Sequence, residues 1–394
     1  MSQPELRVLG VMTGTSCDGL DAACLSFSSS SWRTLWTRSI PYSSSLRNRV
    51  FAYQEPKSKH STVDLLSLNR DLGAWYGKVL KEMIQEFDPD SRPHVIANHG
   101  QTVAHFPKAH VTFQMGDATL ISTQTATTSI SQFRNGDMAV GGQGAPLVPV
   151  FHRLLARQFA GSGEGVVIQN MGGIGNLTYV GPGGSLISFD TGPGNVWIDA
   201  AVSKITRGKF KMDTDGKIAA QAAPNPAVIK KLLSHKFFKL APPKSTGRDE
   251  INPTYFFSKA GKLKGAAMVS TATAATVETL AMAYENYILS KGVPIYKIFL
   301  VGGGAKNPAI IHGLQARMGN IPVASLAQQE INPQFVEAQA FALYGLMCLF
   351  GKPIGGPWTG AQGFGPPGLI CPGSNWNEVL ERVTALKTSG VRYL

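Results

Sequence analysis

The chain has 394 residues, of which 43% are hydrophobic and 16% charged; this composition excludes a disordered protein and is typical of a globular one. A single hydrophobic core rarely organises more than about 250–300 residues, so we expect two domains. The formal net charge is +12, but the basic residues are dispersed in short clusters and no aromatic-basic alternation marks a binding face, so we expect an anionic substrate and no nucleic-acid partner.

The N-terminal residues are polar and lack the apolar core of a signal peptide. No apolar run reaches the ~20 residues that a membrane-spanning helix needs, so we expect no membrane partner. The four cysteines form no CxxC pair, as is usual where a reducing compartment keeps thiols free. These features together predict a cytoplasmic location.

The first strand runs into a turn of small residues that contains Gly14, Thr15 and Ser16. Asp18 follows, and a second apolar strand covers residues 22–27. Main-chain N–H groups and hydroxyls in such a turn can surround phosphate oxygens, and a carboxylate beside them can hold a hard cation. An ordinary glycine-containing hairpin is the alternative interpretation.

The rest of the chain alternates strand-like and helix-like patterns. Residues 62–87 have apolar side chains at helical spacing, and a buried strand at 94–97 follows, ending in a polar segment. After residue 130 the pattern begins again, and a second strong helix at 274–289 precedes a strand at 298–301. One strand–turn–helix–strand theme used twice predicts an α/β fold.

Four turns share a plan in which small residues and one polar or acidic group follow a buried strand. They cover residues 10–21, 169–176, 189–195 and 301–307. In this order, across two α/β halves, they resemble the actin/sugar-kinase/Hsp70 superfamily. There, two hairpin turns hold the ATP phosphates and a later Gly-Gly-Gly loop passes the adenosine. The resemblance implies a two-domain actin-like ATPase (ribonuclease H-like) fold with a central interdomain cleft.

Within this superfamily the chain resembles the anhydro-N-acetylmuramic acid kinase family, to which the levoglucosan kinases are similar. The resemblance covers nearly the whole chain and rests on long, ordered motifs, at residues 12–19, 98–102, 133–139, 141–147, 169–176, 189–195, 243–248 and 336–338. It implies a domain I of residues 1–130 with 338–394, and a domain II of residues 131–337.

The activity that the resemblance implies is an ATP-dependent kinase with Mg²⁺, which opens the 1,6-anhydro bridge of a small sugar and phosphorylates O6. Water attacks the anomeric carbon in this reaction, so a carboxylate is needed to take its proton. Asp190 follows an apolar strand and matches the catalytic base of the family. An Asp that caps a turn is the alternative. The family also suggests a possible homodimer.

Further residues match the family's binding positions. Asp18 and Glu337 match positions near the metal, although a carboxylate at a helix start is also favoured by the helix dipole. The positions that match substrate-binding residues of the family are Gln101, Arg134, Asp137 and Glu337. For Arg134 and Asp137 the alternative is an Arg–carboxylate pair that holds a loop. The nucleotide-binding set is Gly14, Thr15, Ser16, Gly172, Gly173, Asn176, Gly302, Gly303, Gly304 and Asn307.

Two positions depart from the family pattern. Gln132 stands where an acid is common, which could alter the polarity of the sugar site, and Gly175 replaces a frequent Ala. His99 receives no catalytic role, and the segment 244–248 has either a phosphate or domain-interface role or is a solvated loop. Levoglucosan is the alternative substrate to anhydro-N-acetylmuramic acid. A non-catalytic sugar and nucleotide sensor on the same fold is the alternative function.

Overall fold

The computed structural model consists of two compact units, and each is described by itself. Unit 1 comprises residues 1–151 and 335–394, and unit 2 comprises residues 152–334. Residues 131–151, which the sequence analysis placed in the second domain, therefore belong to unit 1. The structure describes residues 4–14, 17–54, 59–159, 164–247, 250–329, 331–391 and 393–394.

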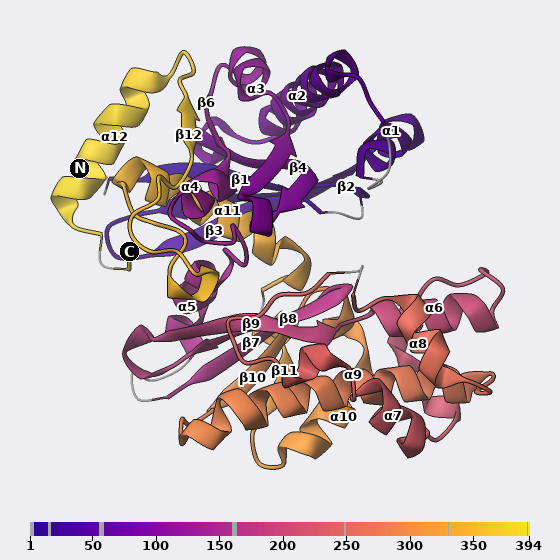
Figure 1. The fold of residues 1–394 in the computed structure, drawn as a ribbon. Helices are drawn as coiled ribbons and strands as arrows, with labels where there is room; N and C mark the ends of the chain where they lie inside the picture. Colours follow the sequence, from indigo (N-terminus) through magenta and orange to yellow (C-terminus); the bar gives the residue numbers. More distant parts are fainter. Residues whose placement is uncertain are drawn as a thin grey trace. The chain divides into compact units, whose positions relative to one another are not determined.

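Unit 1 contains one mixed sheet, with the strand order β12-β6-β4-β1-β2-β3 and with β5 paired to β4 (Figure 1). The first three strands pair antiparallel in chain order, whereas β4 is parallel to both β1 and β6. The strands are β1 (Leu6–Thr13), β2 (Gly19–Phe27), β3 (Trp32–Pro41), β4 (Val95–Phe106), β5 (Val111–Met115), β6 (Thr128–Ser131) and β12 (Leu369–Cys371).

Alternate residues of β1 face two different layers of side chains. Leu9 and Val11 belong to a core that includes the apolar face of the helix at residues 62–85. Gly10 faces the other way, and a Cβ there would lie 1.9 Å from the carbonyl oxygen of Ala338. Only glycine allows α11 to approach the strand this closely. The helices of unit 1 are α1 (Ser44–Gln54), α2 (Thr62–Gln85), α3 (Ala118–Thr125), α4 (Phe133–Ala139), α11 (Val336–Phe350) and α12 (Trp376–Ser389), and α5 (Pro149–Phe159) crosses into unit 2.

The helix expected at residues 62–87 is therefore present as α2. Its N-terminus is defined by Ser61, whose side chain accepts from the backbone N–H of Asp64, while Asp64 accepts in return from Ser61. The strand expected at 94–97 is longer than predicted. It continues as β4 through the polar segment 98–102, because β5 pairs with this half of the strand.

Unit 2 contains a second mixed sheet, with the order β11-β10-β7-β8-β9. Its first three strands again pair antiparallel in chain order, and β10 is parallel to both β7 and β11. The strands are β7 (Val166–Met171), β8 (Ile174–Val180), β9 (Leu186–Pro193), β10 (Lys297–Val301) and β11 (Val323–Ser325). The helices are α6 (Val196–Ile205), α7 (Pro226–Leu232), α8 (Pro253–Ala260), α9 (Ala266–Tyr287) and α10 (Pro308–Met318).

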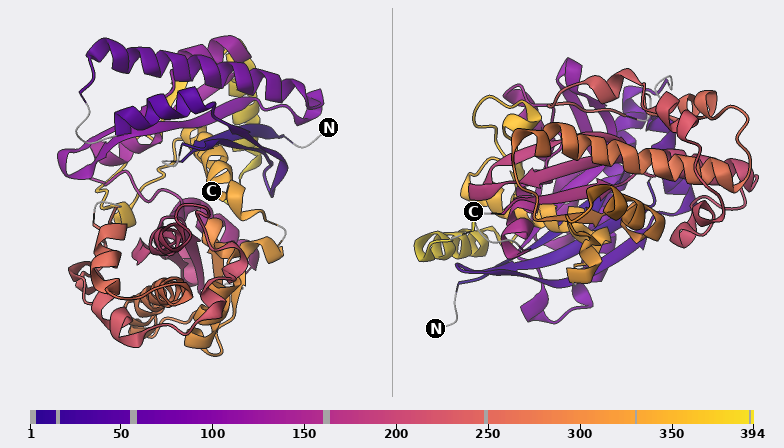
Figure 2. Two further views of the ribbon diagram at one scale, coloured as in Figure 1. Left: turned by 90° about the vertical axis from the view of Figure 1, so that its right-hand side faces the viewer. Right: turned by 90° about the horizontal axis from the view of Figure 1, so that it is seen from below.

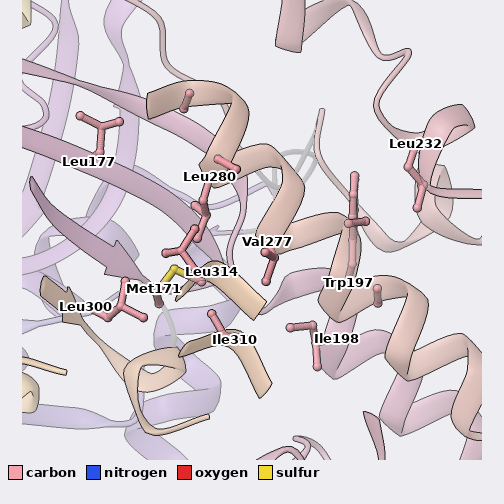
Figure 3. Close-up of a cluster of buried hydrophobic side chains, with 14 of the residues drawn as sticks. Met171, Leu177, Trp197, Ile198, Leu232, Val277, Leu280, Leu300, Ile310 and Leu314 are labelled. Atoms are coloured by element: carbon pink, nitrogen blue, oxygen red, sulfur yellow. The ribbon is translucent and has the colours of Figure 1, made fainter. Parts of the chain in front are cut away.

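The long helix α9, orange in Figure 2, packs against β9, α6 and α10. It forms the centre of the core of unit 2, where Leu280 and Val277 lie near Trp197 and Leu314 (Figure 3). Short 3₁₀ turns connect the elements of both units: η1 (Pro89–Ser91), η2 (Pro107–Ala109), η3 (Pro182–Gly184), η4 (Thr214–Gly216), η5 (Ala219–Gln221), η6 (Lys236–Lys239), η7 (Leu289–Lys291), η8 (Gly303–Lys306), η9 (Leu326–Gln329), η10 (Pro333–Phe335) and η11 (Pro357–Thr359).

The two sheets share one plan: third, second and first strand antiparallel, then two parallel strands on the far side of the first. The predicted α/β fold with one theme used twice is confirmed. The placement of residues 131–151 has a physical reason. In α4 a Cβ on Gly136 would lie 1.8 Å from the carbonyl oxygen of Pro366, so this helix packs directly on the C-terminal segment of unit 1. Among the described residues, no helix combines the length and the apolar character needed to cross a bilayer.

Candidate active site

The turn between β1 and β2 is closed by main-chain contacts. The Cys17 N–H donates to the Gly14 carbonyl at 3.2 Å, and Cys17 adopts a left-handed conformation with φ 53°. Gly19 begins the next strand, and a Cβ there would lie 2.2 Å from the carbonyl oxygen of Ile40. These contacts fix the two described ends of the turn, at Gly14 and at Cys17 to Gly19. Thr15 and Ser16, two of the expected nucleotide-binding residues, lie outside the described residues.

Gln101 is fully buried and binds the main chain at the start of this turn. Its Nε2 donates to the Gly14 carbonyl at 3.1 Å, and its Oε1 accepts from the Tyr42 hydroxyl at 3.2 Å. Tyr42 and Tyr76 are joined through their hydroxyls at 2.7 Å. Both ends of the Gln101 amide therefore have protein partners. Gln101, which was predicted to bind the substrate, therefore supports the turn at Gly14 through its side-chain amide.

The two carboxylates expected near a metal have different surroundings. The Asp18 side chain is 69% exposed, and its Oδ1 lies 2.8 Å from Nη2 of Arg47. Glu337 lies in the first turn of α11 and is half-buried. Burial and the neighbouring charge of Asp21 raise the pKa of Glu337, while Arg134 opposes this shift. A cation beside Glu337 would therefore be favoured.

Arg134 is anchored by two hydrogen bonds from its guanidinium. Its Nε donates to Nε2 of His99 at 3.1 Å, and its Nη1 donates to the Gly144 carbonyl at 2.7 Å. Burial and the charge of Arg134 hold the pKa of His99 well below its usual value, so this imidazole is neutral and accepts. Sequence analysis assigned His99 no catalytic role, and in the structure this residue of β4 is a hydrogen-bond partner of Arg134.

Asp137 is buried and ties three segments together. Its Oδ2 accepts from the Gly144 N–H at 2.7 Å, and its Oδ1 accepts from the Thr359 hydroxyl at 2.6 Å. Any Cβ on Gly142 or Gly355 would collide with the carboxylate, at 2.2 and 1.7 Å. Burial raises the pKa of Asp137 despite these bonds. Asp137 and Arg134 thus bind the same residue, Gly144, and hold the loop in this way.

In unit 2 the corresponding turn is a two-residue hairpin of glycines. The Gly172 carbonyl accepts from the Asn195 N–H at 2.7 Å, and the Gly173 carbonyl accepts from the N–H groups of Gly194 and Val196 at 3.0 and 3.1 Å. These contacts satisfy N–H groups at the start of α6. A Cβ on Gly194 would lie 2.2 Å from the Gly172 carbonyl oxygen, so this corner accepts only glycine.

The Gly-Gly-Gly loop after β10 meets the same corner. Gly302 has φ 79°, and a Cβ there would lie 2.5 Å from Oδ1 of Asn170; a Cβ on Gly304 would lie 2.7 Å from Oδ1 of Asn195. Asn307 ends the loop and caps α10, because its Oδ1 accepts from the Ala309 N–H at 3.0 Å. Gly302 thus approaches the main chain of Met171, which precedes Gly172, and Asn195 lies against both Gly172 and Gly304.

A row of polar side chains crosses the sheet beside this corner. Asn170 pairs with Asn176, and Asn176 pairs with Asp190, so all three point to one face of the sheet. Asn176 and Asp190 were expected from the sequence, whereas Asn170 was missed. The signal for Asn170 was available, because the two-glycine turn fixes which residues of β7 and β8 are opposite each other.

Asp190 lies on β9, and a neighbouring loop positions both its backbone and its side chain. Its N–H donates to the Lys244 carbonyl at 3.0 Å, and its Oδ2 accepts from the Thr246 N–H at 2.9 Å. Burial raises the pKa of Asp190 to about 6, and the Thr246 bond and the Lys244 charge oppose this effect. A carboxylate with this pKa is ionised at neutral pH and is a stronger base than an exposed one.

A groove of about 260 Å³ runs between α9 and α10 of unit 2. The side chains that line it are mostly small and weakly polar. The groove ends at an ion pair in which Nε of Arg317 lies 2.9 Å from Oε1 of Glu278. Ala309, which lies two residues beyond Asn307, forms the end nearest the glycine loop. The lining residues are Ala219, Ala220, Ser270, Thr273, Ala274, Val277, Glu278, Ala309, Gly313 and Arg317.

Two units with the same strand order, each with a glycine turn after its first strand, define a protein of the actin-like ATPase class. The profile of the family described as anhydro-N-acetylmuramic acid kinase matches residues 6–372. The chain belongs to this family and is an enzyme, an anhydro-sugar kinase.

Individual relatives agree with this assignment. The anhydro-N-acetylmuramic acid kinase of Acidithiobacillus ferrooxidans is 35% identical over 96% of this chain and 95% of its own. That of Caldanaerobacter subterraneus is 33% identical over 87% and 90%. Among solved structures, the chain is similar to a ROK family glucokinase from Streptomyces griseus, with 10% identity, a TM-score of 0.36, and coverage of 86% and 98%.

Proposed function

We propose that this enzyme opens the 1,6-anhydro ring of 1,6-anhydro-N-acetylmuramic acid with water and phosphorylates O6 from ATP. The products are N-acetylmuramic acid 6-phosphate and ADP, which places the reaction in the recycling of cell-wall sugars. The observation that carries the proposal is the buried carboxylate of Asp190, whose pKa is raised to about 6 and whose orientation is fixed by the Thr246 N–H. Membership of the family supports the choice of substrate.

Asp190 acts as the general base. It takes a proton from the water that bonds to the anomeric carbon, while the bond from this carbon to O6 breaks. The electron pair left on O6 forms the new bond to the γ-phosphorus, and the bond from this phosphorus to the ADP oxygen breaks. The proton remains on Asp190 until it is released to solvent. The raised pKa of Asp190 suits this task, since a base is most effective with a pKa near the operating pH.

The nucleotide is proposed to bind at the glycine corner of unit 2, and the role of Gly14 in unit 1 stays a prediction from the sequence. At the glycine corner the absence of side chains allows phosphate oxygens to approach the main chain. The groove between α9 and α10 begins beside Asn307 and offers the adenosine a small, weakly polar surface. Asn176 lies between these glycines and Asp190 in the sheet register.

Mg²⁺ is proposed to be held through Asp18 and Glu337. Among the described residues no group of three or more His, Cys, Asp or Glu side chains is arranged as a metal site. Two carboxylates nevertheless suit this ion, which usually binds one or two of them together with phosphate oxygens and water. Burial and Asp21 raise the pKa of Glu337 although Arg134 opposes this shift, so a further cation would favour its ionised form. When bound, Mg²⁺ neutralises the phosphate charge during transfer.

Arg134 is proposed to bind the sugar, with Asp137 and Gln101 holding its surroundings in place. Its hydrogen-bond partner His99 is neutral, and although the charges of Glu337 and Asp137 act on the guanidinium, burial strengthens its attraction to a further anionic group. The lactyl carboxylate of anhydro-N-acetylmuramic acid provides one, whereas levoglucosan does not. We therefore expect the muramic acid derivative to be the better substrate.

The proposal is tested by a coupled assay of ADP release with both sugars. Turnover is expected with anhydro-N-acetylmuramic acid, at a kcat/KM well above that for levoglucosan. A preference for levoglucosan would change the substrate but keep the chemistry. Absence of turnover with either sugar, in protein that binds ATP, would favour a non-catalytic sensor. Homodimerisation and a cytoplasmic location stay predictions.

A further inference from the structure

The Lys244 side chain occupies an aromatic cage in unit 2. Its ammonium nitrogen lies 4.7 Å from the ring centre of Phe237, 5.0 Å from that of Tyr287 and 5.6 Å from that of Phe189. It also lies 3.5 Å from the Phe237 carbonyl oxygen. Lys244 is only 9% exposed. A lysine so far removed from water is unusual without a carboxylate partner, and ring faces compensate part of its desolvation.

The cage itself is well ordered by contacts among its members. Phe189 and Tyr287 pack edge to face, with ring centres 5.3 Å apart. The Tyr287 hydroxyl donates to the Leu240 carbonyl at 2.7 Å, which ties α9 to the segment between η6 and Lys244. Phe189 and Phe237 are almost completely buried. The three rings come from β9, η6 and α9, so the ammonium joins three elements.

The cage is directly connected to Asp190. Phe189, one of its walls, precedes Asp190 on β9, and the Lys244 carbonyl accepts from the Asp190 N–H at 3.0 Å. Two residues further on, the Thr246 N–H binds the Asp190 carboxylate. Lys244 therefore begins the loop that binds both the main-chain N–H and the side-chain carboxylate of Asp190. Glu250, the nearby acid of this segment, accepts from the Thr246 hydroxyl and pairs with Lys236 at 3.6 Å.

We propose that Lys244 is a positioning residue for Asp190: the caged ammonium fixes the loop that holds the carboxylate, and its positive charge keeps that carboxylate ionised. This inference rests on the proposed role of Asp190 as the base. The two groups influence each other, because Lys244 lowers the pKa of Asp190 and Asp190 raises that of Lys244, whose pKa burial lowers to about 8. With its ammonium enclosed by rings, Lys244 acts on the reaction through Asp190.

The test is Lys244→Met, which keeps an unbranched apolar side chain in the cage but removes the charge. The acid limb of the kcat/KM profile is expected to move to higher pH by about 0.5–1 unit, at the lower end of the effect of a neighbouring opposite charge. The KM for ATP should change less than twofold. Lys244→Arg, which restores the charge, is expected to return the limb toward its original pH. Lys204→Met is the matched control, because Lys204 lies 4.1 Å above a single ring, Phe257, and is exposed.

A measurement without turnover separates this inference from the proposed function. The Asp190 carboxyl is titrated by ¹³C NMR in protein labelled at aspartate, and its signal is assigned by its loss in Asp190→Asn. A higher pKa in Lys244→Met than in the original protein supports the inference even if Asp190 proves not to be the base. An unchanged pKa in a folded Lys244→Met variant overturns it. A rise in the KM for ATP with no change in the pH profile also overturns it, because Lys244 would then contact the nucleotide.

Discussion

The two units have the same strand order but differ in the turn that follows the first strand. In unit 1 residues 14–18 connect β1 to β2 and include the exposed carboxylate of Asp18. In unit 2 only Gly172 and Gly173 connect β7 to β8, and their carbonyls are bound by the start of α6. The first turn presents a charged side chain, that of Asp18, whereas the second presents only main-chain groups.

The charged residues differ in the same sense. In unit 1 the buried groups Arg134 and Asp137 both bind Gly144, and Glu337 approaches from α11. In unit 2 Asp190 and Lys244 belong to one loop contact, and each changes the pKa of the other. A duplicated fold thus supplies two similar frames. In the proposed function, one frame holds several polar groups that bind substrate, and the other holds the base, Asp190, whose ionisation Lys244 adjusts.

The largest expected effect is on the base of unit 2. Asp190→Asn keeps an oxygen that can accept from the Thr246 N–H but removes the proton acceptor, so kcat should fall by at least about 10³-fold. ATP affinity by calorimetry should change less than threefold. The melting temperature should stay equal or rise, because an ionised carboxylate whose pKa is raised by burial destabilises the fold at neutral pH. Activity within tenfold of the original would remove Asp190 from its role.

Arg134 tests the binding frame of unit 1. Arg134→Lys keeps the charge but cannot reach both His99 and the Gly144 carbonyl with one compact ammonium group. We expect kcat/KM for the anhydro sugar to fall about 100-fold, with the KM for ATP nearly unchanged. Arg70→Lys is the control, because Arg70 pairs with Asp71 at the surface of the same unit. If kcat/KM falls equally for the anhydro sugar and for ATP, Arg134 has no specific role in binding the sugar.

The pH profile tests the ionisation of Asp190 in the unaltered enzyme. Below about pH 6 the protonated carboxyl cannot accept a proton from water, so kcat/KM should fall with decreasing pH and approach a tenfold loss for each further unit. Activity is retained above this value, since Asp190 is then ionised. The measurement is kcat/KM in constant-ionic-strength buffers from pH 5 to 8. An acid limb near pH 4, the usual range of an exposed Asp, would contradict the burial of this group.

Sequence reasoning was most successful where a local pattern determines the structure. Helix α2 follows from its apolar spacing, and the position of Asp190 follows from the apolar strand before it. The turn expected at residues 169–176 is present but shorter than predicted, because β7 extends to Met171 and β8 begins at Ile174. In each case the residues that decide the structure are close neighbours in the chain.

Contacts between distant segments could not be predicted in this way. The cage of Lys244 joins rings at positions 189, 237 and 287, and no spacing in the sequence connects them. The bond from Thr359 to Asp137 joins the two stretches of the chain that form unit 1, and no local pattern predicts that residues 131–151 contact the C-terminal stretch. Polar side chains at strand ends indicate a site, but their partners are set by tertiary packing.

The groove of unit 2 gives a smaller effect. Gly313 lies in its lining, and a Cβ there would be 3.1 Å from Cγ2 of Val277, so Gly313→Leu should fill part of the space. The KM for ATP is expected to rise about five- to tenfold while kcat stays within twofold. Ala316→Leu is the matched control, because Ala316 is exposed on the same helix and does not line the groove. An unchanged KM in Gly313→Leu would exclude the groove as the adenosine surface.

The smallest expected effect comes from the overall charge of the two units. Basic residues outnumber acidic ones about two to one in unit 2 and are nearly balanced in unit 1. A cationic nucleotide-binding unit accelerates the arrival of an anionic ligand, and salt screens this attraction. The kcat/KM for ATP should fall about threefold between about 0.02 and 0.5 M KCl, with little change in kcat. The matched comparison is the kcat/KM for levoglucosan at saturating ATP, because this sugar is uncharged. If both sets of values fall equally, salt acts on the enzyme as a whole, and the charge of unit 2 has no role in recruiting the nucleotide.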